Sequence, residues 1–496
     1  MPLSPLLPPT RPILRSLPCK LHKSLVPSSL PHLHPILTYF TRRFFTFFSG
    51  THHLTDQALH QKYGPIIRIG PNSLSFSSLS AFNAIYGFTP TNKSFEKGDF
   101  YRFAREAGTG AENIFSARTD AAHRLHRRNL VGPALTSSRI LSYAPTIAFQ
   151  ASRLQICLEK ALNGGKRLNV VEYIHRYTLC TMISVIYGPA VVDEEWMNSH
   201  SSQGLLPALR AVSKFSWGSP LLPWFGALMN TPFMKSVTRK PKFNAQGYKI
   251  GIGALMERLG TVFTHPELST KAERPSIFKN LMEVPQNDSR KLDMKQISME
   301  CNNLVFAGPG STAAALTSVL YQLAKHQGWQ DRIRSEIQGN ELPTTGPLLT
   351  AVIKETLRLH APFPTAFPRT ITHGAENAIP NLPAPLPLDT TVSAHTFILG
   401  RSKEVWGYDA EDWKPERWLE GEKGRLDENF VAFGGGPRGC IGREIAMMVI
   451  ERAVIELVSK WELRAREQLE GKSYIEMQYK ECWIIFRERG KGHAKE

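Results

Sequence analysis

The chain has 496 residues, of which 42% are hydrophobic and 21% charged, so it can bury a large core and is neither a disordered nor a collagen-like sequence. Its 60 basic and 43 acidic residues give a formal net charge of +17, which favours acidic partners such as nucleic acid, anionic lipid or an acidic protein. The six cysteines lie far apart without a CxxC spacing, which excludes the pattern of a disulfide scaffold or a zinc module.

The segment 1–54 has a composition of its own, because it contains no Asp or Glu and is crowded with prolines. Prolines interrupt its longest uncharged run, 24–41, so we predict no membrane-spanning helix there. An aromatic-basic patch over 39–48 fits a membrane interface, and the acid-poor composition fits a transit peptide; a poorly ordered tail or a mis-assigned start is the simplest alternative. We therefore expect an atypical Pro-rich basic leader over 1–54 and a folded domain over 55–496.

Short apolar runs at 66–69 and 74–76 flank the turn signal Gly-Pro-Asn at 70–72. Two such runs around a turn predict a β-hairpin. Beyond residue 140 the apolar spacing is mainly helical, with expected breaks at 163–165, 217–223 and 284–288.

Four prolines between 379 and 387 preclude a regular helix in that segment. The predicted fold class is thus mainly α with small β-sheets near the N-terminal part and again in the last third.

A long apolar segment, 297–323, predicts a core helix that is interrupted by Ala-Gly-Pro-Gly-Ser-Thr at 307–312. Pro309 has no N–H to donate to the carbonyl of Val305, and the two flanking glycines lower the energetic cost of a kink. We expect a local distortion with a groove beside it.

Glu355 and Arg358 lie three residues apart in a predicted helix, so they share one face and can form an ion pair. Solvated helix faces contain this spacing constantly, so the pair carries weight only together with other motifs.

The segment 433–444 holds five glycines around Cys440 and leads into an apolar helical stretch, 445–458. Glycines allow a backbone to approach a flat ligand closely, and amides at a helix N-terminus stabilise a thiolate. Phosphate binding is disfavoured, because the loop has neither a Gly-Lys-Ser/Thr ending nor a GxGxxG spacing with a downstream acid. A metal-ligating thiolate and a structural turn with a buried free cysteine remain.

Phe433, Gly436, Arg438, Cys440 and Gly442 occupy every fixed position of F-x-x-G-x-R-x-C-x-G. This is the haem-ligating signature of the cytochrome P450 superfamily, which the chain resembles over about 55–490. The segment 57–72 looks like the entrance region of fungal members. The resemblance implies a single large cytochrome P450 fold that encloses haem b.

By this resemblance Cys440 is the axial thiolate of the haem iron, which favours O–O cleavage. Phe433 shields the thiolate, Gly436 and Gly442 shape the loop, and Arg438 pairs with a haem propionate. The segment around His123 and Arg127 looks like the family's W-x-x-x-R helix, with His123 at the aromatic position. The resemblance makes His123, Arg127 and Arg369 further propionate ligands.

The segment 414–418, Lys-Pro-Glu-Arg-Trp, resembles the family's P-E-R-F/W element. The resemblance implies that Arg417 joins Glu355 and Arg358 in a buried network beneath the haem. The role of these three residues is structural.

The apolar helix departs from the family pattern A-G-x-[D/E]-T-[T/S]. Gly310 stands in place of the acid, and Ser311 in place of the Thr, that relay protons in the family. Ser311 and Thr312 remain the candidate catalytic residues, since general-acid delivery needs a donor within hydrogen-bond reach. The departure raises the expectation of unusual chemistry.

The resemblance implies a haem-thiolate monooxygenase of fungal secondary metabolism, oxidising a hydrophobic small molecule with dioxygen and electrons from an NADPH-cytochrome P450 reductase. The expected location is the cytosolic face of the endoplasmic reticulum membrane, and no nucleic-acid module is present. A haem-thiolate enzyme of oxidative coupling, desaturation or isomerisation is the alternative, and a non-catalytic haem protein is the second. Expected substrate contacts lie at 95–115, 205–233, 306–312 and 363–367.

Overall fold

The computed structural model describes part of the 496-residue chain: residues 46, 48–70, 72–88, 95–101, 104, 112–189, 191, 205–221, 231, 242–243, 249–250, 252–270, 274–338, 346–420 and 423–489. Predictions for the leader up to residue 45, for most of 102–111 and for most of 222–233 lie outside the described residues.

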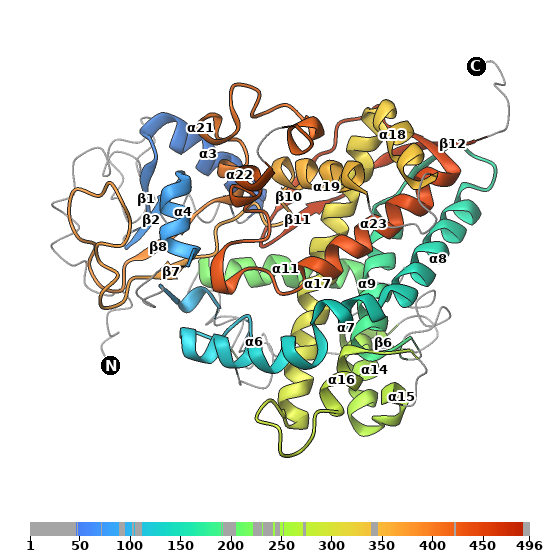
Figure 1. Cartoon of the computed structure of the whole chain (residues 1–496), viewed down its shortest axis with the longest axis horizontal. Coiled ribbons are helices and arrows are strands. Elements are labelled where there is room, and N and C mark those ends of the chain that lie inside the picture. Colours follow the sequence, from blue (N-terminus) through green and yellow to red (C-terminus); the bar gives the residue numbers. More distant parts are fainter. Residues whose placement is uncertain are drawn as a thin grey trace.

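A long helix, α17 (Met294–Lys325), runs through the middle of the molecule (Figure 1). Its first turn is fixed by a capping box, in which the Asp293 side chain accepts from the Gln296 amide and the Gln296 side chain accepts from the Asp293 amide. Most of its residues are buried, as expected for a helix that is apolar on nearly all sides. It packs along α9 (Val171–Tyr187), which is buried to a similar extent, so the two helices form the centre of the main core.

The helical conformation of α17 continues across Pro309, where the sequence predicted an interruption. The Ser311 hydroxyl donates to the carbonyls of Ala307 and Gly308, at 2.9 and 3.2 Å. The Ser311 side chain thus supplies a hydrogen-bond donor to carbonyl groups on the turn that the proline disturbs.

Within the described part of the chain, α17 is also the one helix long and apolar enough to cross a membrane. Because most of its apolar stretch is buried inside the protein, its composition is that of a core helix.

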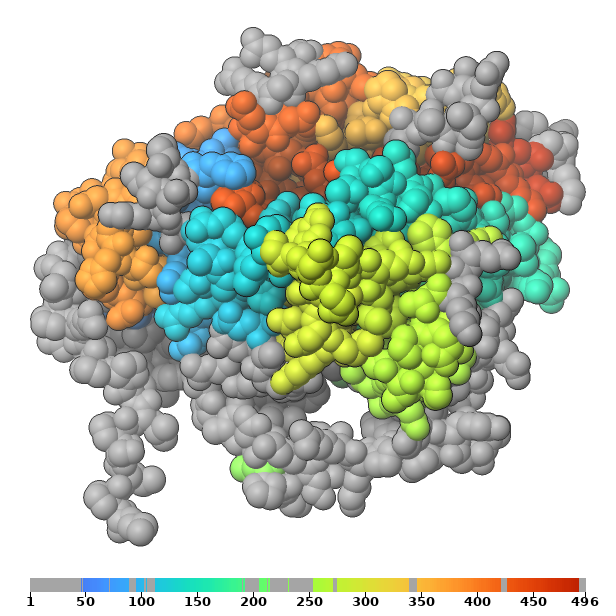
Figure 2. Space-filling model, turned by 60° about the horizontal axis from the view of Figure 1, so that its bottom comes forward, coloured from blue at the N-terminus to red at the C-terminus, as the bar shows by residue number. Residues whose placement is uncertain are grey.

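Most of the remaining helices lie around α17, whereas α3 and α4 lie beside the strands at the left of Figure 1. Four of them, α6, α14, α15 and α16, lie together on the face drawn in Figure 2. Their bounds are α3 (His52–Tyr63), α4 (Leu79–Tyr86), α6 (Asp120–Ala134), α7 (Ser137–Ser142), α8 (Ala144–Leu162), α11 (Leu206–Leu221), α14 (Ile252–Thr264), α15 (Glu267–Thr270), α16 (Ile277–Met282), α18 (Gln327–Gln338), α19 (Pro347–Leu359), α20 (Thr396–Leu399), α21 (Lys403–Trp406), α22 (Lys423–Glu428) and α23 (Arg443–Lys460), with 3₁₀ turns η2 (Asp99–Tyr101), η4 (Pro415–Trp418) and η5 (Gly436–Arg438).

The main sheet has the strand order β1-β2-β8-β7-β3. Strands β1 and β2 form the predicted antiparallel hairpin. Strand β2 then pairs in parallel with β8, so the N-terminal hairpin and two strands of the last third, β7 and β8, belong to one sheet. The bounds are β1 (Ile66–Gly70), β2 (Ser73–Phe76), β3 (Glu96–Lys97), β7 (Arg369–Thr370) and β8 (Thr391–Ala394).

Smaller sheets complete the described part of the fold. Strands β4, β12 and β9 form a three-stranded sheet, while β5–β6 and β10–β11 are two-stranded. The hairpin β10–β11 is fastened to α17, because the hydroxyls of Tyr479 and Ser318 lie 2.9 Å apart. The bounds are β4 (Arg167–Asn169), β5 (Lys242–Phe243), β6 (Lys249–Ile250), β9 (Trp461–Arg464), β10 (Gly471–Ser473), β11 (Met477–Tyr479) and β12 (Trp483–Glu488).

The predicted helix breaks are confirmed at two of three places. Helix α8 ends at Asn163, which adopts the left-handed conformation with φ 42°, and a loop separates α16 from α17. The break expected at 217–223 is wrong in its first part, because α11 continues to Leu221. A glycine within a helix costs only about 1 kcal/mol, which the packing of α11 on α9 offsets. The proline-rich segment 379–387 contains no helix, as predicted.

Candidate functional site

Cys440 lies in the loop between η5 and α23, where its amide donates to the carbonyl of Phe433 at 2.8 Å. The loop is pressed against α4. Gly436 has φ +61°, and a Cβ atom at this position would overlap the Tyr86 carbonyl oxygen and lie 2.8 Å from the carbonyl carbon of Gly87. Only glycine fits both the conformation and the space.

The Cys440 side chain keeps accessible surface, yet burial raises the pKa of its thiol. The Gly442 amide and the charges of Arg127 and Arg443 act in the opposite direction. The predicted stabilisation by the helix N-terminus is therefore present but outweighed. The thiol is thus surrounded by protein yet keeps surface that a ligand can reach, and a thiol becomes a thiolate when it binds a metal ion.

Gly442 and Phe433 lie in the loop on either side of Cys440. A Cβ atom on Gly442 would meet no other atom within 4 Å, so the backbone is open to a ligand at this point. Phe433 is partly buried against the main core and makes an edge contact with Phe430 at 6.1 Å between ring centroids. The Arg443 guanidinium lies 5.5 Å from the Phe433 ring centroid.

The structure brings the predicted basic residues together. His123, on the first turns of α6, is buried, and its pKa is lowered to about 3 by burial and then by four neighbouring positive charges. We call His123 and these neighbours the basic cluster, which consists of Lys97, His123, Arg127, Arg369 and Arg438.

Few negative groups balance the basic cluster. Asp120 accepts hydrogen bonds from Nε and Nη2 of Arg438 at 2.9 and 2.6 Å, whereas the buried Nη1 of Arg438 has no hydrogen-bond partner among the described residues. Lys97 and Arg369 are directly opposite in the β3–β7 pair, and like charges in such a pair are destabilising. Carboxylates of a ligand would complete this arrangement.

The other donors of the basic cluster hold it in position. Arg369 Nη1 donates to the Tyr101 hydroxyl and to the Pro368 carbonyl, the latter at 3.1 Å. Lys97 Nζ donates to the Phe115 carbonyl at 2.7 Å, and burial together with the positive charges of Arg369 and Arg438 lowers its pKa. Arg127 Nη1 reaches the Gly439 carbonyl at 3.4 Å, next to Cys440.

A group of aromatic rings borders the basic cluster. Phe367 lies 5.4 Å from Phe363, 6.2 Å from Phe115 and 6.5 Å from Tyr101, measured between ring centroids. Two of the predicted substrate-contact ranges, 95–115 and 363–367, therefore meet in space. On α17, Phe306 is 39% exposed, and the adjacent Ala307 is exposed as well, in a helix whose other central residues are mostly buried or partly buried.

The predicted Glu355, Arg358 and Arg417 form one buried network. Glu355 has no accessible surface and accepts from Arg358 Nε at 2.9 Å, from Arg358 Nη2 at 2.8 Å and from Arg417 Nε at 2.9 Å. Trp418 Nε1 and the Lys414 amide donate to the same carboxylate at 3.0 and 2.8 Å. Each Glu355 oxygen is thus shared by several donors, which fixes α19 to η4.

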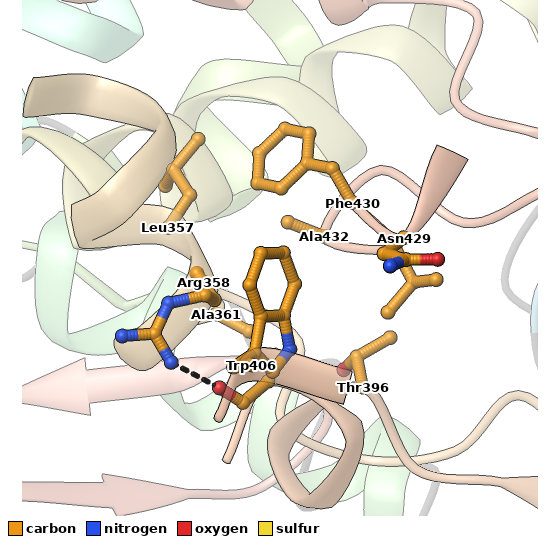
Figure 3. A pocket seen from close by; sticks show the side chains of 10 residues that line it. Leu357, Arg358, Ala361, Thr396, Trp406, Asn429, Phe430 and Ala432 are labelled. Atoms are coloured by element: carbon orange, nitrogen blue, oxygen red, sulfur yellow. Dashed lines mark hydrogen bonds between the residues drawn. The ribbon is translucent and has the colours of Figure 1, made fainter. Parts of the chain in front are cut away.

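A small pocket separates this network from the segment that leads into the Cys440 loop (Figure 3). Arg358 borders it and donates to the Gly400 carbonyl, while Leu357, Trp406 and Phe430 supply its apolar walls. The pocket is separate from the basic cluster, since none of the cluster's residues lines it.

Sequence reasoning missed three polar residues of this region: Lys97, Asp120 and Glu476. Lys97 belongs to this region because β3 pairs with β7. Asp120 belongs to it because it contacts Arg438, which lies 318 residues away in the sequence. No local motif marks either position. Arg124 and Arg128, which lie on α6 beside His123 and Arg127, are exposed.

The donors described here suit a flat, dianionic, iron-containing porphyrin. One thiol keeps accessible surface, and a glycine-lined loop permits close approach. The buried positive charges, with one guanidinium nitrogen that has no partner among the described residues, can bind two carboxylates.

Comparison with known proteins agrees with this arrangement. The family model for cytochrome P450 matches residues 30–478. The chain is 23% identical over 439 residues to cytochrome P450 monooxygenase mfmA of Annulohypoxylon moriforme, covering 83% of this chain and 82% of that protein. It is 26% identical over 432 residues to cytochrome P450 monooxygenase gsfF of Penicillium aethiopicum, covering 82% of each.

Similarity also extends to the tryprostatin B 6-hydroxylase of Aspergillus fumigatus, at 25% identity over 441 residues, which are 84% of this chain and 72% of that protein. The matched region includes the Cys440 loop, the basic cluster and the Glu355 network. The chain therefore belongs to the cytochrome P450 family and is a mainly α-helical, haem- and iron-binding monooxygenase related to fungal enzymes.

Proposed function

We propose that the protein is a haem-thiolate monooxygenase that oxidises a hydrophobic small molecule, an intermediate of fungal secondary metabolism, with electrons from an NADPH-cytochrome P450 reductase. The observation that supports this most directly is the accessible Cys440 thiol with Arg127 of the basic cluster next to it. The proposed cofactor is haem b with Cys440 as the axial ligand.

Bound haem would supply oxygen activation by thiolate-ligated iron. The chain's own residues would orient the group and exclude water. The proposed propionate ligands are Arg438, Arg369, Arg127 and His123, and Lys97 joins them because it lies in the same cluster. Phe433 shields Cys440, while Gly436 and Gly442 leave room for the ring.

The proposed substrate surface is apolar and aromatic. It consists of the rings around Phe367 together with Phe306 on α17. A product is expected when the co-expressed protein and reductase receive apolar metabolites of fungal origin, and product analysis by mass spectrometry tests this directly. A reduced, CO-bound spectrum without the thiolate-specific absorbance would contradict the cofactor assignment.

A second candidate function is oxidative coupling, desaturation or isomerisation by the same haem-thiolate centre. Gly310 favours it, because no acid stands at the usual place in α17 and the demand for protons differs in such reactions. Incorporation of labelled oxygen into the product separates the two functions.

Location and organisation are proposed in the same way. The domain from 55 to 496 would sit at the cytosolic face of the endoplasmic reticulum membrane, near its reductase, with 1–54 as a leader. Near the boundary between the two, the leader contacts the domain, because the carbonyl of Gly50 accepts a hydrogen bond from the Ser473 amide at 2.7 Å.

Arg438→Gln is expected to lower the haem content of the purified protein severalfold. The change removes the guanidinium that carries the unpaired buried nitrogen, and charge-assisted bonds of this kind contribute about 1.5–3 kcal/mol each. Haem per protein, measured as the pyridine haemochrome, checks this. The exposed Arg124→Gln on the same helix as His123 is the control and should load haem normally; equal loading of both variants would remove Arg438 from the site.

Ser311→Ala is expected to raise the fraction of NADPH electrons that end as hydrogen peroxide. The Ser311 hydroxyl donates its hydrogen to the carbonyls of Ala307 and Gly308, and its oxygen can still accept a hydrogen bond from water in a proton chain. Peroxide formed per NADPH consumed is the measurement, with Ser298→Ala, nearer the start of α17, as control. Unchanged coupling in Ser311→Ala would exclude the hydroxyl from proton delivery.

A further inference from the structure

The acid that is missing from α17 has a counterpart on another element. A Cβ atom on Gly310 would lie 2.5 Å from Oε2 of Glu476 and closer still to Oε1, below the 3.0 Å that real Cβ contacts keep. The Glu476 carboxylate therefore fills the space that a side chain at position 310 would need. Gly310 and Glu476 are complementary, since the absence of one side chain makes room for the other.

Glu476 sits in the turn between β10 and β11, and this turn is held on three sides. The Met477 amide donates to the Pro362 carbonyl at 2.8 Å, Gln478 Nε2 donates to the Arg210 carbonyl at 3.1 Å, and Tyr479 is bonded to Ser318 of α17. Within the turn, the Tyr474 amide donates to the Glu476 carbonyl at 3.1 Å. The carboxyl is thus presented to α17 by a fixed scaffold.

The surroundings keep this carboxyl ready to hold a proton near neutral pH. Burial raises the pKa of Glu476 to about 7, although the neighbouring Ser213 hydroxyl and the Arg210 charge oppose the effect. Glu476 is only partly covered, so its carboxyl keeps contact with solvent or a ligand. Other charged or titratable groups near the turn are Glu172, which interacts with Arg210, Lys214, whose Nζ lies 5.2 Å from the Tyr474 ring centroid, and the partly exposed His175, whose pKa burial lowers to about 3.

We propose that Glu476 is the acid of the proton path in this enzyme and replaces the carboxylic acid that α17 lacks at Gly310. The inference rests on the proposed monooxygenase function. In that reaction R–H, dioxygen, two electrons from the reductase and two protons give R–OH and water. The O–O bond breaks, a C–O bond forms, and Glu476 passes its proton through Ser311 or water to the oxygen that leaves as water, then regains a proton from solvent.

The position beside Ser311 supports this assignment. Glu476 contacts the residue that directly precedes Ser311, on the turn whose carbonyls the Ser311 hydroxyl occupies. An ionised carboxylate that binds a substrate cation would need a pKa well below neutrality, whereas this carboxyl is shifted in the opposite direction.

The first test needs no turnover. Because the folded protein holds the Glu476 proton more tightly than the unfolded chain, Glu476 adds stability below its ordinary pKa of 4.5, and this is lost as the pH rises through about 7. The melting temperature of Glu476→Gln minus that of the wild type should therefore increase between pH 5 and pH 7 and level off above. A difference that is flat with pH would show that Glu476 has an ordinary pKa and would overturn the proposal.

The second test uses the holoenzyme with hydrogen peroxide and guaiacol, which requires neither the reductase nor the natural substrate. Cleavage of the O–O bond of peroxide requires a proton of the peroxide to move onto the oxygen that leaves as water, and a carboxyl in the proton path would carry it there. Glu476→Gln should lower the rate of guaiacol oxidation about 100-fold, the low end of general-acid contributions, and Glu476→Asp should lose less. Glu470→Gln, an exposed glutamate beside β10, is the matched control and should keep the rate.

The third test moves the acid back into the helix. Gly310→Asp alone should lower the melting temperature, because its Cβ and the Glu476 carboxyl compete for one space. Gly310→Asp combined with Glu476→Gly should restore both the melting temperature and part of the guaiacol rate. A merely structural Glu476 would give back the stability without the rate, which would overturn the proposal.

The reduced CO spectrum of each variant separates the two levels of the argument. If the wild type lacks the thiolate-specific absorbance, the proposed function fails and the inference with it. If wild type and Glu476→Gln share the spectrum and the same guaiacol rate, the proposed function stands and the role of Glu476 alone fails.

Discussion

Cys440→Ala is expected to abolish the thiolate-specific absorbance of the reduced, CO-treated protein and to leave no measurable monooxygenase activity. The side chain is the one thiol at the glycine-rich loop, and burial keeps its pKa high until a metal ion replaces the proton. Loss of the ligand removes the electron donation on which oxygen activation depends.

Cys157→Ser provides the matched comparison. Cys157 is partly exposed on α8, outside the Cys440 loop, so its replacement should keep the spectrum and the haem content. A Cys440→Ala protein that still showed the thiolate-specific absorbance would place the ligand elsewhere and contradict the assignment made from the loop.

Glu355→Gln is expected to destabilise the fold by about 3–5 kcal/mol, the cost of removing one partner from a buried ion pair. The neutral amide no longer balances the two positive charges of Arg358 and Arg417. Its single oxygen also accepts fewer and weaker hydrogen bonds than the carboxylate did. Domains are stable by only about 5–15 kcal/mol, so much of the protein should be lost from the soluble, haem-loaded fraction. Soluble yield and the midpoint of thermal unfolding measure the effect.

The neighbouring Glu416→Gln separates burial from charge. Glu416 lies in the same η4 turn and pairs with Arg332 at 2.9 Å, but the Arg332 side chain is 42% exposed and that of Glu416 32%. Exposed pairs of this kind contribute about 0–1 kcal/mol, so this variant should unfold close to the wild type. Similar losses in both variants would mean that the Glu355 network is not the element that holds α19 to η4.

Local motifs predicted the centre of the site better than its edges. The Cys440 loop is one continuous segment, and Glu355 and Arg358 lie within one turn of a helix. Glycine content identifies the first and spacing the second. The helix break expected at Trp217 failed because packing against α9 outweighs the weak preference of a glycine.

Residues contributed by distant segments could not be predicted in this way. Lys97 joins the basic cluster through a two-residue strand opposite Arg369, and Glu476 reaches Gly310 from a turn more than a hundred residues later. Neither has a spacing rule that relates it to its partner. The absence of an acid at position 310 was the one sequence signal, since a lost function at one position suggests looking for its replacement in space.

The parallel pairing of β2 with β8 has a consequence for how the protein acquires its cofactor. Residues Ser73 and Thr391 are neighbours in the sheet, so its register is set only after most of the chain has been synthesised. Closing so large a loop is entropically costly and makes such pairing slow. Lys97 and Arg369 meet in the same sheet, so the positive charges that would bind the haem carboxylates come together late in folding, when the ligand can itself stabilise them.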